Sequence, residues 1–422
     1  MSAQRAKDVA ESLRETDAQL KRIADIARLL PALTAENAAQ ERLRLTLELA
    51  RGRTPTPKWS RSKRRVEPAT FRRLETARAR IEGHPARTIY EPRLEELELE
   101  LRMIEALGDA RRIRPLAARR FGTGRTQIEL RRGGPPLPPG LRFAAGASTT
   151  LGDLARAIMA SLSHEEEPRV VPALAPPGQR SLYQIMAYAA RRAGLDVDVR
   201  VEPRLSAGAA TGDRTIFIAD RRFGRRECLR FAVHEVLGHA VAAANARSQP
   251  IRIYEVGTAG SFATQEGMCL ALEEAAGVLD SYRLRIIAAR VLATDRMHDG
   301  ARFGETARWL KDEHGFSPED AIGVVERAYR GGGVARDAGY LAGWLAVREA
   351  LATNETSFDA LRMGRVGLTV AKRAPELLTM GLARPSRYRP SLAPSLFATA
   401  GGTSFETSPP SVAASFTMLE ET

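Results

Sequence analysis

Cysteine, histidine, lysine and long apolar runs are all scarce in this chain of 422 residues. The only two cysteines, Cys228 and Cys269, cannot form the disulfide framework of a secreted scaffold. No run of about 18 uncharged apolar residues is present, which excludes a membrane-spanning helix. The N-terminus also lacks the pattern of a secretory signal. We therefore expect a soluble protein of the reducing cytoplasm, and its 44% apolar content excludes a wholly disordered chain.

The chain is basic, with a formal net charge of +13, but lysine supplies only six of its 64 basic residues. This bias toward arginine, with abundant alanine, is typical of a GC-rich genome and weakens the case for an anionic partner. Residues 51–80 concentrate the excess, with 11 basic and two acidic residues. Their only aromatic residues are Trp59 and Phe71, and no recognition motif accompanies them. A solvated, partly irregular connector is therefore favoured, and an acidic partner or a nucleic acid is the alternative.

The first third of the chain is predicted to be helical. Apolar residues at helical spacing predict helices over 8–30, closed by Pro31, and over 38–50 and 92–107. Residues 133–140, GGPPLPPG, must be irregular, because proline lacks the amide hydrogen and restricts its predecessor. We therefore expect three parts: a helical N-terminal portion (1–135) that contains the basic connector, a second domain (145–382), which the motifs below predict to be catalytic, and a disordered tail rich in Pro, Ser, Thr and Ala (383–422).

The middle of the chain changes character. Thr150 and Asp153 predict a capping box that opens a helix. Alternating apolar residues from Leu195 to Val201 and the run 215–219, TIFIA, predict two short strands. Helices are predicted over 180–193, 227–244, 262–276, 279–293, 302–312, 318–329, 336–351 and 368–382. The predicted fold class is α+β and mainly helical, with a small sheet beside packed helices.

Residues 231–242, FAVHEVLGHAVA, contain the most informative motif. His234 and His239 lie five residues apart in an otherwise apolar helix, and Glu235 follows the first of them. Imidazole nitrogens are common zinc ligands, and an adjacent glutamate can take a proton from a metal-activated water. The motif therefore predicts a hydrolytic zinc site. Under the alternative of two ordinary histidines, an acid among such apolar neighbours would be hard to explain.

The five-residue spacing sets a geometric condition. At about 100° per residue, five steps of an α-helix turn the second histidine about 140° away from the first. Both imidazoles can share one ion only if an extra residue is absorbed, as in a π-bulge. Gly238, directly before His239, lowers the cost of such unwinding. We therefore expect a π-bulge in this helix.

A catalytic zinc site usually has three protein ligands and one open position. Glu266, on the first turns of the helix predicted over 262–276, is the preferred third ligand. The alternative is an acid favoured there by the helix dipole. Glu273 and Glu274 are fallback ligands that better suit salt bridges, and Cys269 is expected to be an inert buried thiol, because a further ligand would close the open position.

Two blocks of this sequence resemble a known family. His234-Glu235-Val-Leu-Gly-His239, followed by Gly260 and Thr264-Gln265-Glu266-Gly267, is similar to the bacterial family named for its QEGLA motif, a relative of the microtubule-associated tyrosine carboxypeptidases of animals. Arg330-Gly331-Gly332-Gly333 and Arg336-Asp337-x-x-Tyr340-Leu341 resemble a later block of that family. The resemblance is best over about 150–370. Met268-Cys269 stands where the family usually has Leu-Ala, which affects packing rather than ligand chemistry.

The resemblance implies a zinc-peptidase-like core in which His234, His239 and Glu266 bind Zn²⁺ and Glu235 is the general base. It also implies a carboxypeptidase that trims C-terminal residues, with aromatic residues as one candidate. Tyr340 could then donate to the oxyanion, and Arg330 or Arg336 could hold a substrate carboxylate. The alternatives are a non-catalytic or regulatory zinc-binding protein and a basic nucleic-acid-binding protein.

Overall fold

The computed structural model describes residues 3–61, 64–129, 148–163, 167–176, 179–203, 205 and 207–391. The expected boundary at 133–140 and most of the expected tail, from residue 392, lie outside these residues. Within them, no helix has the length and apolar character needed to span a bilayer.

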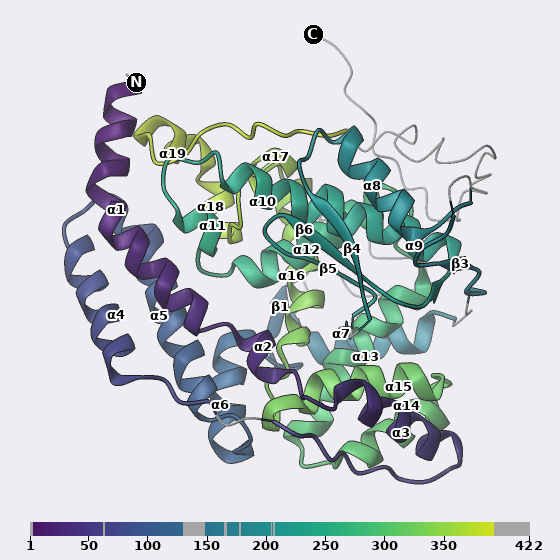
Figure 1. Cartoon of the computed structure of the whole chain (residues 1–422). Helices are drawn as coiled ribbons and strands as arrows, with labels where there is room; N and C mark the ends of the chain where they lie inside the picture. The colour runs from purple at the N-terminus through teal and green to yellow at the C-terminus, as the bar shows by residue number, and fades with distance from the viewer. Residues whose placement is uncertain are drawn as a thin grey trace.

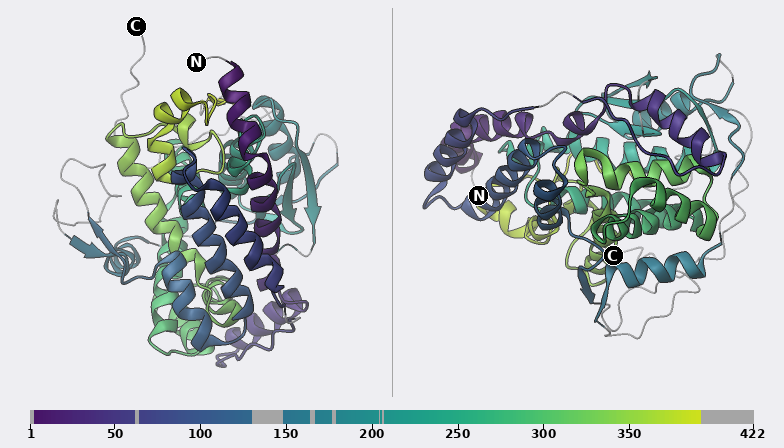
Figure 2. Two further views of the ribbon diagram at one scale, coloured as in Figure 1. Left: turned by 90° about the vertical axis from the view of Figure 1, so that its left-hand side faces the viewer. Right: turned by 90° about the horizontal axis from the view of Figure 1, so that it is seen from below.

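The N-terminal helices lie mostly side by side along one edge of the molecule, except that the third, over residues 38–50, lies apart from them at the bottom of the view in Figure 1 (Figures 1 and 2). They are α1 (Ala3–Ile26), α2 (Leu29–Leu33), α3 (Ala38–Ala50), α4 (Pro68–Ile81), α5 (Arg87–Glu105) and α6 (Ala110–Phe121). Residues 68–80 of the basic connector lie in α4, which packs on α1 and α5. The prediction that one helix runs from 8 to 30 and ends at Pro31 is wrong. The helix ends at Ile26, and Pro31 lies in the first turn of α2, where proline removes no intrahelical hydrogen bond.

Three small sheets accompany the helices. The largest has the order β4 (Asp198–Glu202), β6 (Thr215–Ala219), β5 (Ala209–Thr211), with β4 parallel and β5 antiparallel to β6. The other two pair β1 (Gln127–Glu129) with β2 (Ser148–Thr150), and β3 (Val171–Pro172) with β7 (Arg222–Phe223). The strands predicted over 195–201 and 215–219 correspond to β4 and β6, whereas β5 was not predicted because Ala-Ala-Thr is too short to show a period.

The remaining helices lie both above and below the sheet in the view of Figure 1. They are α7 (Leu151–Ser161), α8 (Leu182–Arg192), α9 (Arg225–Phe231), η1 (Ala232–Ala240), α10 (Val241–Ala246), α11 (Ile253–Val256), α12 (Ser261–Ala275), α13 (Ser281–His298), α14 (Phe303–His314), α15 (Pro318–Tyr329), η2 (Arg330–Gly332), η3 (Arg336–Ala338), α16 (Gly339–Ala352), α17 (Phe358–Leu361), α18 (Leu368–Lys372) and α19 (Ala374–Met380). The predicted capping box of Thr150 and Asp153 is confirmed at the start of α7. The single helix predicted over 368–382 is instead divided at Arg373. The fold class, α+β and mainly helical, is confirmed.

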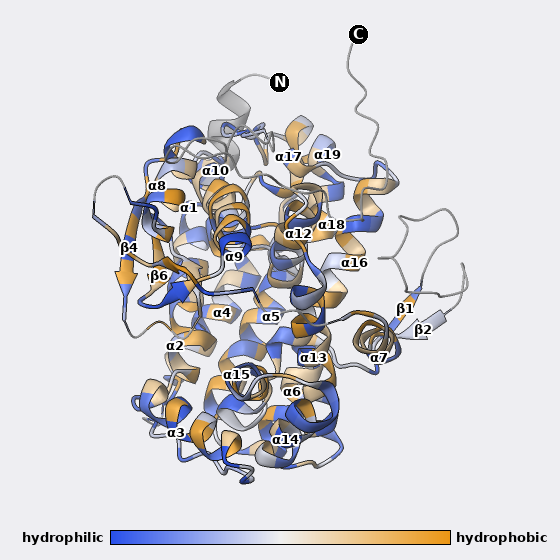
Figure 3. Ribbon diagram, turned by 90° about the vertical axis from the view of Figure 1, so that its right-hand side faces the viewer, coloured by the Kyte–Doolittle hydropathy of each residue, from blue (hydrophilic) through white to orange (hydrophobic). Residues whose placement is uncertain are grey.

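Helix α12 is central to the packing, and its close contact with α16 depends on two glycines. A Cβ at Gly267 would lie 2.2 Å from the backbone of Gly343, and one at Gly343 would lie 1.9 Å from the carbonyl oxygen of Ala263. Neither position tolerates a side chain without moving backbone. Helices α10 and α12 are largely apolar along their length (Figure 3). This close packing fixes the position of α12, the helix that carries Glu266.

The buried apolar residues form two cores that meet at η1. One core joins the N-terminal helices to α12–α16, and it includes Val233 of η1. The other contains the β4–β6–β5 sheet, α8 and α9, and it includes Val236 and Leu237 of η1. The helix that carries both histidines is therefore held from two sides.

Candidate metal centre

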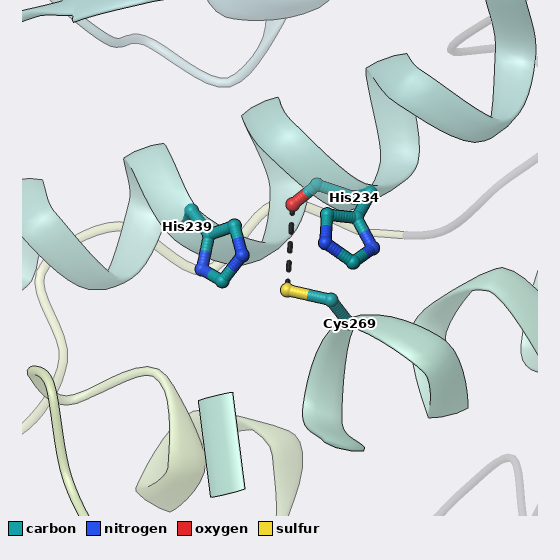
Figure 4. A group of neighbouring side chains, drawn as sticks. All are labelled: His234, His239 and Cys269. Carbon is teal, nitrogen blue, oxygen red and sulfur yellow. Dashed lines mark hydrogen bonds between the residues drawn. The ribbon is translucent and has the colours of Figure 1, made fainter. Parts of the chain in front are cut away.

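The two histidines lie in a π-helix. Residues Ala232–Ala240 form η1, which is continuous with α9 before it and α10 after it. The wider i→i+5 turn carries five residues through about one turn, so side chains five apart project from the same face. The ring centroids of His234 and His239 are 4.9 Å apart, and the rings are inclined by 76° (Figure 4). The predicted local widening is confirmed, and it extends over nine residues rather than one bulged position.

Gly238 allows η1 and α12 to pack closely. A Cβ at this position would lie 2.3 Å from Sγ of Cys269, which comes from α12. Gly238 is not among the positive-φ glycines, so the backbone freedom we expected of it is not what the fold uses. The absence of a side chain lets α12 approach η1 closely enough for Glu266 to reach the histidines.

Glu266 completes a convergent group of three donors. Its Oε2 lies 3.3 Å from Nε2 of His234 and 3.7 Å from Nε2 of His239. This oxygen is buried and has no hydrogen-bond partner among the described residues. Ligands bound 2.0–2.2 Å from a tetrahedral zinc ion lie about 3.3–3.6 Å from one another. The first distance lies in this range and the second just above it, so these two distances and the unsatisfied oxygen are compatible with Glu266 as a ligand beside the histidines.

Burial and charge act in opposite directions on these groups. Burial lowers the pKa of His234, but its contacts with Glu266 and Glu273 outweigh burial and raise this pKa to about 9. Burial raises the pKa of Glu266, but the two histidines outweigh it and hold the pKa of this carboxyl well below its usual value. Without a metal, the site thus holds a protonated His234 beside an ionised Glu266. A metal ion must displace that proton to bind.

Cys269 is a second candidate for the third ligand. Ligand atoms of His234, His239 and Cys269 all lie within 4.8 Å of one another (Figure 4). However, its thiol donates to the backbone oxygen of His234 at 3.4 Å, and burial raises its pKa well above its usual value. A thiol that is buried, protonated and turned to the helix backbone suits packing better than coordination. Glu266 is the other candidate: its Oε2 lies 3.3 and 3.7 Å from the two Nε2 atoms, and the histidines hold the pKa of its carboxyl below its usual value, which favours a charged donor.

Glu273 contacts His234 on the side of the imidazole opposite to Glu266. Its Oε1 accepts a hydrogen bond at 2.7 Å from Nδ1 of His234, which leaves Nε2 facing Glu266. Its Oε2 lies 3.5 Å from Nε of Arg283. The predicted salt-bridge role is confirmed for Glu274 with Arg348 and for Glu273 with Arg283. The fully buried Glu273 also contacts His234, an expected ligand. Sequence reasoning missed this contact, although seven residues after Glu266 is two helical turns and thus the same face.

Glu235 faces the sheet. Its Oε2 accepts a hydrogen bond of 2.7 Å from the hydroxyl of Thr211, the last residue of edge strand β5. The same hydroxyl lies 3.1 Å from the backbone oxygen of Glu235. The carboxylate is buried, and the hydrogen bond from Thr211 holds its orientation. No sequence signal pointed to Thr211, because β5 shows no strand period.

The structure places Tyr340, Arg330 and Arg336 together on the α15–α16 side of α12. The ring of Tyr340 packs edge-on against Phe262 at 5.9 Å, one helical turn before Glu266. Burial, together with the carboxylates of Glu266 and Asp337, raises the pKa of the Tyr340 phenol, so it stays a hydrogen-bond donor at neutral pH. Both arginines face Asp337, at 3.6 Å for Arg330 and 4.0 Å for Arg336.

A cavity of about 250 Å³ adjoins this region. Phe262 and Arg336 line it, together with residues of α1, α5 and α6. Phe262 lies one helical turn before Glu266 on α12, and none of the three candidate donors lines the cavity.

Comparisons with known proteins identify a related family. The family model described as "Microtubule-associated tyrosine carboxypeptidase" matches residues 49–406. This match agrees with the resemblance seen in the sequence motifs. No curated protein and no solved structure shows a significant match.

Proposed function

Because the chain belongs to the microtubule-associated tyrosine carboxypeptidase family, which marks it as a carboxypeptidase-like peptide hydrolase, we propose that it is a zinc-dependent carboxypeptidase. The observation that carries the proposal is the convergence of His234, His239 and Glu266, with 3.3 and 3.7 Å between their donor atoms. Glu235 lies beside them as general base. A peptide or protein C-terminus is the substrate class.

The residues around the site have separate tasks. A bound zinc ion would polarise the scissile carbonyl and lower the pKa of a bound water toward neutrality. Glu235 accepts the proton of the attacking water and passes it to the leaving amine. Tyr340 donates a hydrogen bond to the developing oxyanion, and Arg330 and Arg336 bind the terminal carboxylate of the substrate.

Metal analysis and turnover of two variants test the proposal. Wild type should contain about one zinc ion per chain and release the last residue of a mixed peptide library, measured by mass spectrometry. Glu235→Gln should retain the metal and lose turnover, because the amide cannot accept the proton. His234→Ala should lose both.

The alternatives predict different results. A non-catalytic zinc protein would bind the metal through His234 and cleave no peptide. A nucleic-acid-binding protein would lack stoichiometric zinc and would show steeply salt-dependent binding mapped to residues 51–80. Zinc retained at full stoichiometry by His234→Ala would contradict the proposed site.

A further inference from the structure

Strand β5 is an outer strand of the largest sheet, and it pairs with β6 alone among the described strands. Just beyond β5, the amide of Gly212 donates to the carbonyl oxygen of Thr215 at 2.8 Å, which marks these two as a hydrogen-bonded pair of the ladder. Such pairs alternate with non-hydrogen-bonded pairs along an antiparallel ladder. The N–H and C=O groups of Thr211 and Ala209 therefore point away from β6.

These outward groups form an unpaired main-chain edge, which we call the β5 edge. No main-chain hydrogen bond joins the outward groups of Ala209 or Thr211 to another described residue. Ala209 is only 6% exposed, and a buried peptide group without a partner is costly. The opposite outer strand, β4, carries the charges of Asp198, Arg200 and Glu202, which discourage pairing, whereas β5 carries none. The β5 edge thus suits a further strand.

The β5 edge adjoins the candidate metal centre through Thr211. The hydroxyl of this residue donates to Oε2 of Glu235 at 2.7 Å, while its peptide groups face outward. Glu235 is the proposed general base, and His234 beside it in the sequence is a proposed ligand. A chain that pairs with Thr211 therefore pairs with the residue that orients the proposed base.

The turn after β5 is held by two arginines. Arg247 donates to the backbone oxygen of Asp213 at 2.6 Å, and Arg365 donates to its carboxylate at 2.7 Å. Asp213 and Phe262 both line the cavity described above, so this cavity reaches from the turn after β5 to the first turn of α12. The end of the strand is thus fixed before a ligand binds, which lowers the entropy lost on pairing.

We propose, on the basis of the function proposed above, that the β5 edge binds the main chain of the peptide substrate upstream of the scissile bond, as an added strand. A peptide main chain carries the C=O and N–H groups that complement those of Ala209 and Thr211. Side chains take no part in these hydrogen bonds. The edge therefore orients the substrate beside Glu235 without selecting its upstream sequence, and it leaves the choice of the released residue to other parts of the site.

A scan of N-methyl groups along the substrate tests the proposal. The probe is a fluorescently labelled peptide from the library above that wild type shortens, and anisotropy measures its affinity for the zinc-loaded, full-length Glu235→Gln variant. Only every second residue of a strand turns its N–H to the β5 edge. Methylation upstream of the scissile bond should therefore weaken binding at alternate positions, by roughly twofold to tenfold at each. Equal effects at successive positions, or no effect at any position, would overturn the proposal.

A variant of the edge provides the complementary test. Ala209→Pro removes one outward N–H without removing a hydrogen bond to β6, and proline is tolerated on edge strands. It should lower kcat/KM for the long peptide roughly twofold to tenfold. An acetylated dipeptide is too short to extend from Thr211 to Ala209, so its kcat/KM should stay at the wild-type value. Equal losses for both substrates would assign Ala209 to the structure of the sheet and contradict the proposal.

The peptide scan changes only the substrate, so it decides the question even when Ala209→Pro fails to fold. Cleavage by wild type together with a flat N-methyl scan would contradict the β5 edge alone and leave the proposed function intact. A zinc-loaded wild type that shortens no peptide would contradict the proposed function itself.

Discussion

Nδ1 of His234 and Oε1 of Glu273 are 2.7 Å apart, and both side chains are buried. The carboxylate fixes the tautomer and the ring orientation of the imidazole, so that Nε2 points to Glu266. Nε of Arg283 lies 3.5 Å from Oε2, the other oxygen of Glu273. The first proposed ligand is therefore positioned by charges from α12 and α13.

Replacing Glu273 should weaken metal binding without abolishing it. In Glu273→Gln, the amide can still contact the imidazole but no longer supplies a charge, and support of this kind is worth roughly tenfold to a hundredfold in metal affinity. Competition with a chelator measures the effect. The neighbouring Glu274→Gln is the matched control, because Glu274 contacts Trp344 and Arg348 and not the histidine. Equal zinc affinity of the two variants would contradict the positioning role.

Adding a methyl group at Gly238 should separate α12 from η1. Its contact with Sγ of Cys269 would be 2.3 Å, and overpacking of this kind costs about 1–3 kcal/mol of the free energy of unfolding. Denaturant unfolding of Gly238→Ala measures this cost. The double variant Gly238→Ala/Cys269→Ala should recover part of it, since the clashing sulfur is gone.

Gly323 offers the control for this substitution. It lies inside α15, and a methyl group at this position would have no neighbouring atom within 4 Å, so Gly323→Ala should gain about 0.5–1 kcal/mol. Destabilisation of Gly323→Ala equal to that of Gly238→Ala would show that steric contact with Cys269 is not the cause.

The metal-free protein should lose stability as the pH rises. Because contacts with Glu266 and Glu273 raise the pKa of His234 to about 9, its protonated form contributes stability that is fully present below 6.5. This contribution disappears as the pH rises through about 9. Unfolding of chelator-treated protein between pH 6 and 9.5 measures the slope, and His234→Gln should flatten it. A stability that rises over this range in wild type relative to His234→Gln would contradict the assignment.

Thr211 should matter for turnover and not for metal content. Thr211→Val removes the hydroxyl that donates to Glu235, so kcat should fall roughly tenfold while KM and zinc content stay near those of wild type. Thr211→Ser keeps the hydroxyl and should restore most of the activity. Loss of zinc from Thr211→Val would indicate that the strand supports the metal instead.

The local part of the site could be predicted from the sequence. His234, Glu235 and His239 belong to one helix, and a five-residue spacing has only one simple way to bring both imidazoles to one face. Glu266 could be proposed because it begins the next long helix. Strand β5 and the break at Arg373 could not be predicted, because three residues carry no period and a helical pattern continues across the break.

By itself, the sequence determined the mainly helical α+β class and the widened turn between His234 and His239, since periodicity and spacing act within one segment. Only the tertiary structure decided that Thr211 holds Glu235 and that Glu273 holds His234. These partners come from separate strands and helices, and nothing local encodes which of them pack together. Their contacts arise when two apolar cores close on η1 and bury charged groups that must find one another.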